Sequence, residues 1–118
     1  MENKKNIPLD IKTNNGESII ICTIKGETDN INIDSVFNKI AEDIKDYNKV
    51  ILNLSELIFC NSKFLGNLFF LADTIEKKGG KLCILGCNPL VYDSLSIVGI
   101  FDVIPYFEDK ESSLDYLK

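Results

Sequence analysis

Apolar residues along this chain occur either in short unbroken runs or at helical spacing. Residues 50–54 form a run of β-branched and aliphatic side chains, which is typical of a strand covered on both faces. Beyond Ser62 the apolar positions return every three or four residues as far as Ile75, and Gly79-Gly80 follows. This spacing predicts a helix that ends at a left-handed glycine. The segment 59–66 therefore joins a strand to a helix.

The N-terminal part of the chain predicts a hairpin and a helix. Residues 7–13 and 18–25 are strand-like, and Asn14-Asn15-Gly16 between them accept the positive φ angles of a tight turn. We expect this pair to form an antiparallel edge, broken at residues 26–29. Apolar residues at helical spacing then predict a helix over 33–47.

The C-terminal part predicts two more strands and two short helices. The strands lie at 81–85 and 103–107. Asn88 and Pro89 begin a helix that ends at Gly99, with Asn88 as the N-cap. Its inward side chains are expected to be Leu90, Val91 and Leu95. The terminal helix spans 112–117, and its expected cap and apolar contacts are Ser112 or Ser113, Leu114 and Leu117.

Together these elements define a fold class. Strands that alternate with helices after one hairpin predict an α/β fold with a mixed, mostly parallel sheet and helices that cross between the strands. A chain of 118 residues is long enough for one hydrophobic core and too short for two. We therefore expect a single domain over residues 1–118.

The charge and composition of the chain limit the classes of partner that it could bind. The net charge is -5, histidine and arginine are missing, and every cation is a lysine. This composition argues against a nucleic-acid partner, because phosphate contacts depend on basic patches and on arginine. The N-terminus lacks the apolar region of a secretion signal, and no apolar run is long enough for a span. We expect a cytoplasmic protein without direct membrane insertion.

The four cysteines do not predict a metal site or a cofactor. Only Cys83 and Cys87 are close in sequence, and neither a second pair nor a histidine accompanies them. We expect small buried thiols in a reducing cytoplasm. An enzyme is also disfavoured, because Ser62 has no sequence-visible base and the acidic turn with Glu27 and Asp29 is more typical of a solvated loop.

With these elements in order, the sequence resembles the STAS family, the anti-sigma factor antagonists of bacteria. The resemblance covers nearly the whole chain, and it implies a STAS-like fold and a regulatory module that sequesters an anti-sigma factor. The residues that carry it are Gly26-Glu27-x-Asp29, the strand and serine at 50–55, Phe59-x-Asn61-Ser62-x-x-Leu65-Gly66, Gly79-Gly80-x-Leu82, Pro89-x-Val91 and Gly99-x-Phe101-x-x-Ile104.

The resemblance also implies a phosphorylation site at Ser62, modified by an anti-sigma factor of the serine kinase type. Asn61 stands where the family usually has aspartate, Lys63 where it has serine or threonine, and Phe64 where it has glycine. Two hypotheses remain open: an antagonist switched by phosphorylation, or a constitutive STAS-type subunit of a signalling complex or transporter. By position alone, Ser62 would serve as the N-cap of its helix.

A helical projection adds a candidate docking residue. At about 100° per residue, Phe70 falls among the polar side chains of its helix, together with Ser62, Lys63 and Gly66. An exposed aromatic in such surroundings is typical of a docking surface, and the alternative is burial under the terminal helix. The predicted partner-binding residues are Asp29, Asn61, Ser62, Lys63, Gly66 and Phe70.

Overall fold

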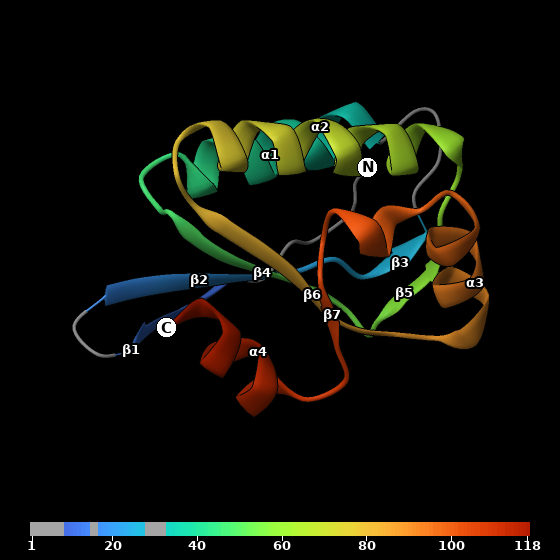
Figure 1. Ribbon diagram of the computed structural model, residues 1–118. Coiled ribbons are helices and arrows are strands. Elements are labelled where there is room, and N and C mark those ends of the chain that lie inside the picture. The colour runs from blue at the N-terminus through green and yellow to red at the C-terminus, as the bar shows by residue number, and fades with distance from the viewer. Residues whose placement is uncertain (1–8, 15–16, 28–32) are drawn as a thin grey trace.

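The computed structural model describes residues 9–14, 17–27 and 33–118, which form a mixed α/β fold (Figure 1). Its strands are β1 (Leu9–Asn14), β2 (Glu17–Thr23), β3 (Gly26–Glu27), β4 (Lys49–Leu54), β5 (Leu57–Phe59), β6 (Lys81–Cys87) and β7 (Tyr106–Phe107). Its helices are α1 (Ile33–Ile44), α2 (Ser62–Lys77), α3 (Pro89–Ile97), the 3-10 helix η1 (Ile100–Asp102) and α4 (Lys110–Leu117).

The main sheet has five strands in the order β1-β2-β4-β6-β7. Strands β1 and β2 pair antiparallel, whereas β2, β4, β6 and β7 run parallel. The register places Ile51 of β4 between Ile21 of β2 and Cys83 of β6. Helix α2 crosses between the parallel strands β4 and β6, as the sequence predicts. The fold class is therefore confirmed, including the N-terminal antiparallel hairpin.

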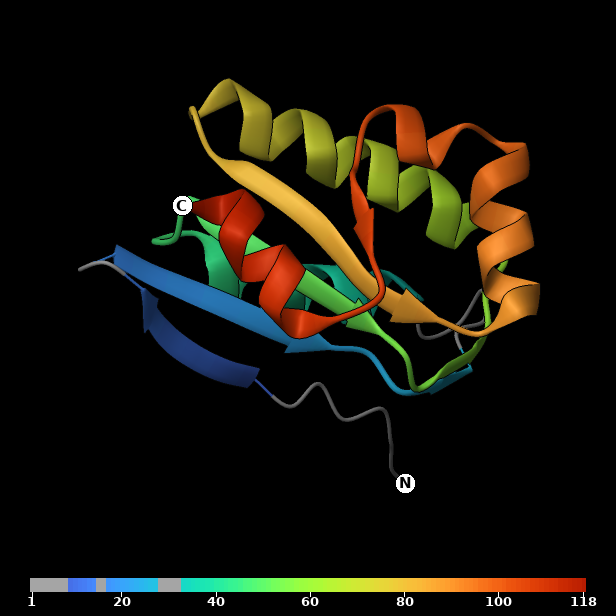
Figure 2. The same cartoon turned by 60° about the horizontal axis from the view of Figure 1, so that its bottom comes forward.

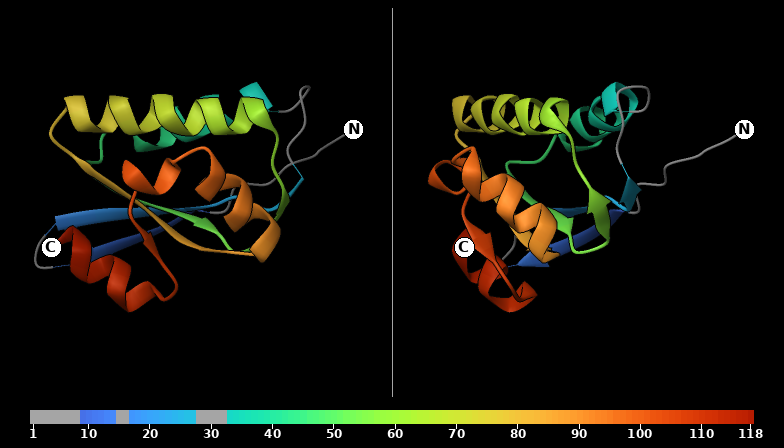
Figure 3. Two further views of the ribbon diagram at one scale, coloured as in Figure 1. Left: turned by 45° about the vertical axis from the view of Figure 1, so that its right-hand side comes forward. Right: turned by 90° about the vertical axis from the view of Figure 1, so that its right-hand side faces the viewer.

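Helices cover both faces of this sheet. Figures 1 and 3 show α1 and α2 side by side over one face, and Figure 2 shows α4 against the other. Val50, Leu52 and Leu54 of β4 point into the core under α1 and α2, whereas Ile51 packs toward α4 with Leu117. This two-residue alternation explains why β4 is apolar at nearly every position: both of its faces are buried.

Several predicted boundaries are wrong. Helix α1 ends at Ile44, and the expected break after the hairpin contains β3, which pairs parallel with β5. The segment 103–107 contains only the two-residue strand β7, because η1 and a turn come before it. Each missed element is a strand of two or three residues or a single 3-10 turn, which is too short to show a hydrophobic period.

The caps and contacts of the last two helices also differ in part. Asn88 caps α3 as predicted, since its side chain accepts a hydrogen bond from the Val91 N–H at 2.8 Å, but Leu90 is 61% exposed and not inward. Helix α4 is capped by Asp109, and not by Ser112 or Ser113, because the Asp109 carboxylate accepts from the Ser112 N–H at 2.7 Å. Asp109 lies one turn earlier and is an equally good cap.

Candidate functional site

The first turn of α2 is capped by Asn61, so the prediction that Ser62 is the cap is wrong. Asn61 has an extended backbone, with φ −112° and ψ 179°, and its side-chain oxygen accepts a hydrogen bond from the Phe64 N–H at 2.9 Å. Its carbonyl oxygen accepts from the Leu65 N–H at 3.2 Å. Asparagine and serine cap equally well. Burial of Phe64 and Leu68 in the core sets the register that selects Asn61.

Ser62 is consequently the first residue inside the helix, and its side chain is exposed. Within the described residues its hydroxyl makes no hydrogen bond, because the capping bond belongs to Asn61. The exposed hydroxyl lies beside the positive end of the helix dipole. A phosphate added there would be stabilised by that dipole and by first-turn N–H groups.

Lys63, the next residue, forms an ion pair with α1. Its ammonium lies 3.1 Å from the Asp34 carboxylate, and the two side chains are 45% and 65% exposed. The pair joins the first turn of α2 to the first turn of α1. Asp34 also offsets the unfavourable position of a cation near a helix N-terminus. Because both groups are exposed, the pair contributes little to stability.

Three exposed apolar residues lie on β5, which precedes α2 in the chain, and on α3, which contacts β5. Ile58 and Phe59 of β5 are 57% and 48% exposed, and Leu90 on the first turn of α3 is 61% exposed. The Asn88 side chain links the two elements, because its amide donates to the carbonyl oxygens of Leu57 at 3.0 Å and Ile58 at 3.3 Å. The sequence pattern does not predict these residues, because β5 is too short to show a hydrophobic period and the helical spacing predicts Leu90 to point inward.

The other predicted residues of α2 share its outer surface. Gly66 is exposed, and Phe70 is 70% exposed, which confirms the helical projection. The alternative, burial of Phe70 under the terminal helix, is wrong, because α4 packs on the opposite face of the sheet (Figure 1). Asp29 lies outside the described residues. Within the described chain, the structure therefore brings Asn61, Ser62, Lys63, Gly66 and Phe70 onto one helix.

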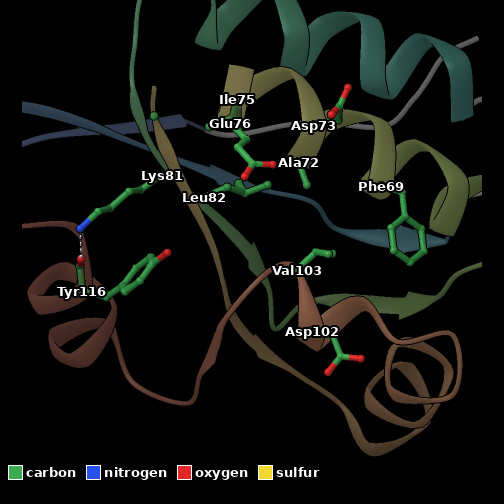
Figure 4. A pocket seen from close by; sticks show the side chains of 11 residues that line it. Phe69, Ala72, Asp73, Ile75, Glu76, Lys81, Leu82, Asp102, Val103 and Tyr116 are labelled. Atoms are coloured by element: carbon green, nitrogen blue, oxygen red, sulfur yellow. Dashed lines mark hydrogen bonds between the residues drawn. The ribbon is translucent and has the colours of Figure 1, made fainter. Parts of the chain in front are cut away.

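A separate hollow of about 400 Å³ lies beside the C-terminal half of α2 (Figure 4). Its charged groups do not converge on one point: Glu76 points toward Leu82, whereas Asp73 and Asp102 point in different directions. The Lys81 ammonium is bound by the Tyr116 carbonyl oxygen at 3.2 Å and lies over the Tyr116 ring. The arrangement in this hollow is not that of a reaction centre, and the hollow does not include Ser62.

The cysteines are free thiols, and three of the four are buried. Burial raises the pKa of Cys22 and of Cys83 to about 12, which keeps both as neutral thiols at neutral pH. Within the described residues, no cluster of three histidine, cysteine or carboxylate side chains could hold a metal ion. None of the described helices combines the length and apolar character of a membrane span.

Comparison with known proteins agrees with this fold. The STAS domain family model matches residues 10–113, so the chain belongs to the STAS domain family. An anti-sigma F factor antagonist from Paenibacillus polymyxa is 27% identical over 112 residues, covering 93% of this chain and 96% of that protein. The chain is thus similar to an antagonist in sequence over almost its whole length.

Solved structures show the same architecture. An anti-sigma factor antagonist from Mycobacterium paratuberculosis superposes with a TM-score of 0.75 at 19% identity, covering 95% of this chain and 94% of that one. The phosphorylated form of the Bacillus cell fate determinant SpoIIAA gives a TM-score of 0.66 at 18% identity, covering 94% and 100%. At these identities the likeness concerns the fold.

Proposed function

We propose that this protein is an anti-sigma factor antagonist that binds an anti-sigma factor through the N-terminal end of α2 and is released when Ser62 is phosphorylated. The observation that carries the proposal is that the Ser62 hydroxyl is exposed and does not cap the helix, because Asn61 makes the capping hydrogen bond. The similarity to the Paenibacillus polymyxa antagonist supports the choice of partner. The proposal assigns the protein to the cytoplasm and to a single regulatory domain without enzymatic activity.

The docking surface would combine polar and apolar groups. Ser62 and Lys63 would supply hydrogen-bonding and charged groups, and Ile58, Phe59 and Leu90 would supply exposed apolar area from β5 and α3. Apolar residues rimmed by polar ones are typical of protein interfaces. Asp29, Gly66 and Phe70 complete the proposed set, with Gly66 and Phe70 extending it along α2.

Phosphorylation would act on docking and leave the fold intact. The Ser62 oxygen attacks the γ-phosphorus of ATP held by the kinase, the bond to ADP breaks, and the hydroxyl proton passes to a base of the kinase. The new group carries about -1.5 to -2 charges at pH 7. It would compete with Asp34 for the Lys63 ammonium, which now lies 3.1 Å from that carboxylate. The first turn of α2, where Lys63 and Asp34 now neutralise each other, would thereby become strongly anionic.

Incubation with the purified anti-sigma serine kinase of the same organism and ATP tests the proposal. Intact mass should rise by one phosphate, and Ser62→Ala should abolish the addition. Unmodified protein should bind the kinase, whereas the phosphorylated protein should not. A phosphate that persists in Ser62→Ala would place the site elsewhere and contradict the assignment.

One observation favours the second candidate, a STAS-type subunit that docks constitutively. Lys63 is already paired with Asp34 at 3.1 Å, so this end of α2 presents a neutral surface that a partner could bind without any change of charge at Ser62. The same incubation separates the two candidates, because a constitutive subunit would bind its assembly with no mass change.

A further inference from the structure

A groove of about 320 Å³ runs between α1 and α2 on the outer surface of the protein. Its floor is apolar and consists of buried side chains from both helices, namely Phe37, Ile44, Leu71 and Ile75. Phe70 forms one wall and is 70% exposed, so most of its ring meets solvent. A small ligand lying on the floor would leave much of that ring uncovered, whereas a macromolecule would cover it.

The middle of the groove carries no charged side chain among its lining residues. Asn38 and Ala41 line it from α1, and Asn67, Phe70 and Thr74 line it from α2. The Asn67 amide donates to the Lys63 carbonyl oxygen at 2.9 Å, and the Thr74 hydroxyl donates to the Phe70 carbonyl oxygen at 2.9 Å. Both polar side chains therefore bond to their own helix. In a chain with 26% charged residues, an uncharged strip around one aromatic resembles the centre of an interface.

Contacts at both ends connect the two walls. At one end, the Lys63–Asp34 pair joins the first turns of α2 and α1. At the other, the Lys78 ammonium donates to the carbonyl oxygens of Ile44 and Lys45, each at 3.2 Å. These contacts show that α1 and α2 run parallel. Because the floor residues are buried in the core, the groove is formed before any partner arrives, which lowers the entropic cost of binding.

The charged residues that line the groove, Lys45 and Lys78, both lie at the end where α1 and α2 finish. The apolar floor is complementary to aliphatic residues along one face of an elongated occupant. The two lysines at one end of the groove are complementary to carboxylates at one end of that occupant. An amphipathic helix meets both needs. If it ran antiparallel to α1 and α2, its first turn, where acidic residues are favoured, would lie over Lys45 and Lys78.

We propose that the α1/α2 groove receives an amphipathic helix of the anti-sigma factor, packed on Phe70 and antiparallel to α2, with its acidic first turn on Lys45 and Lys78. This inference rests on the proposed function and extends its docking surface from the first turn of α2, at Ser62, to the C-cap residue Lys78. The groove would contribute affinity that does not depend on the state of Ser62.

Binding of the purified anti-sigma serine kinase to the unphosphorylated full chain tests this proposal by titration calorimetry. Phe70→Ala should weaken binding at least tenfold, because a central aromatic anchor is lost. Lys45→Glu should also weaken binding, and the difference in affinity from wild type should shrink as the salt concentration is raised.

The matched controls are Phe69→Ala and Lys77→Glu, since Phe69 lines the hollow of Figure 4 and Lys77 pairs with Asp73 at 3.0 Å outside the groove. Both controls should bind as wild type does, and thermal melts should show Phe70→Ala as stable as wild type.

Each other outcome overturns the proposal in a distinct way. If wild type binds and Phe70→Ala binds equally well, the groove is not used and Phe70 leaves the docking set, whereas the proposed binding at the N-terminal end of α2 stands. If wild type does not bind the kinase, the proposed function and the groove assignment fall together. If sedimentation reveals a dimer of wild type that Phe70→Ala dissociates, the occupant is a second copy of this chain.

Discussion

The side-chain oxygen of Asn61 accepts a hydrogen bond from the backbone N–H of Phe64 at 2.9 Å, and this contact starts α2. It separates two tasks that the sequence alone assigns to one residue. Asn61 begins the helix, and Ser62 remains available for modification. Phosphorylation of Ser62 would therefore leave the N-cap in place, and the helix should keep its length in both states.

The first prediction follows from this division. Asn61→Ala should lower the free energy of unfolding by about 0.5–2 kcal/mol, because the cap is lost. Ser62→Ala should change it by no more than about 0.5 kcal/mol, as expected of an exposed residue without a capping bond. Urea unfolding of the two variants beside wild type measures both values. Equal losses in the two variants would mean that Ser62 shares the capping role.

A second prediction concerns pH and α4. Hydrogen bonds from the Ser112 N–H and then from its hydroxyl hold the pKa of Asp109 below its usual value. A carboxylate with a lowered pKa stabilises the folded state above its unfolded pKa of about 3.9. That stabilisation is lost as the pH falls through the lower pKa of the folded state.

Asp109→Asn isolates this contribution, because asparagine keeps the capping oxygen and removes the charge. The melting temperature of wild type should exceed that of Asp109→Asn near pH 7, and the gap should close below about pH 3.9. Melts from pH 7 to pH 2 measure the gap. A gap that stays constant over this range would show that the Asp109 charge does not stabilise α4.

The parts of the fold that the sequence predicts are those with long, regular patterns. The strand around Ile51 and the helix containing Leu68 were found because each buries a periodic set of side chains. Short elements such as β5 and η1 lack a period. Capping residues were misassigned at Ser62 because two good caps stand next to each other, and only the packing of Phe64 distinguishes them.

The candidate site shows the same limit. The exposure of Phe70 follows from its angle on the helix, so the projection predicts it. The Lys63–Asp34 pair and the link from Asn88 to β5 join residues about 30 positions apart in sequence, 29 for Lys63–Asp34 and 31 for Asn88–Leu57. Such contacts depend on how the helices pack on the sheet, and no local pattern in the sequence reveals them.

A third prediction concerns thiol reactivity. The thiolate is the reactive form of cysteine, and burial raises the pKa of Cys22 and Cys83 to about 12. Cys87 is only half-buried, so it should be alkylated first by iodoacetamide at pH 8. Peptide mapping by mass spectrometry over time measures the order. In denaturant all four cysteines should react alike, and early labelling of Cys22 or Cys83 in the native protein would contradict the packing described above.

The last prediction compares Gly66, within α2, with Gly80, which follows the end of that helix. A Cβ added at Gly66 would meet no atom within 4 Å, whereas one added at Gly80 would collide with the Asn48 carbonyl oxygen and press on Ile75. Gly66→Ala should therefore raise the free energy of unfolding by about 0.5–1 kcal/mol, the usual gain for alanine in a helix interior. Gly80→Ala should lower it by about 1–3 kcal/mol, because backbone or core must shift.

Gly66→Ala also tests the docking surface, because stability and binding should move in opposite directions. If the anti-sigma factor approaches α2 closely at Gly66, the added methyl group keeps the two surfaces apart, and affinity should fall although the protein is more stable. Calorimetric titration with the anti-sigma kinase and a thermal melt of the same sample measure the two effects. If Gly66→Ala melts higher and binds as wild type does, Gly66 does not belong to the docking surface. The higher melting temperature would also show that the helix of the variant is correctly folded.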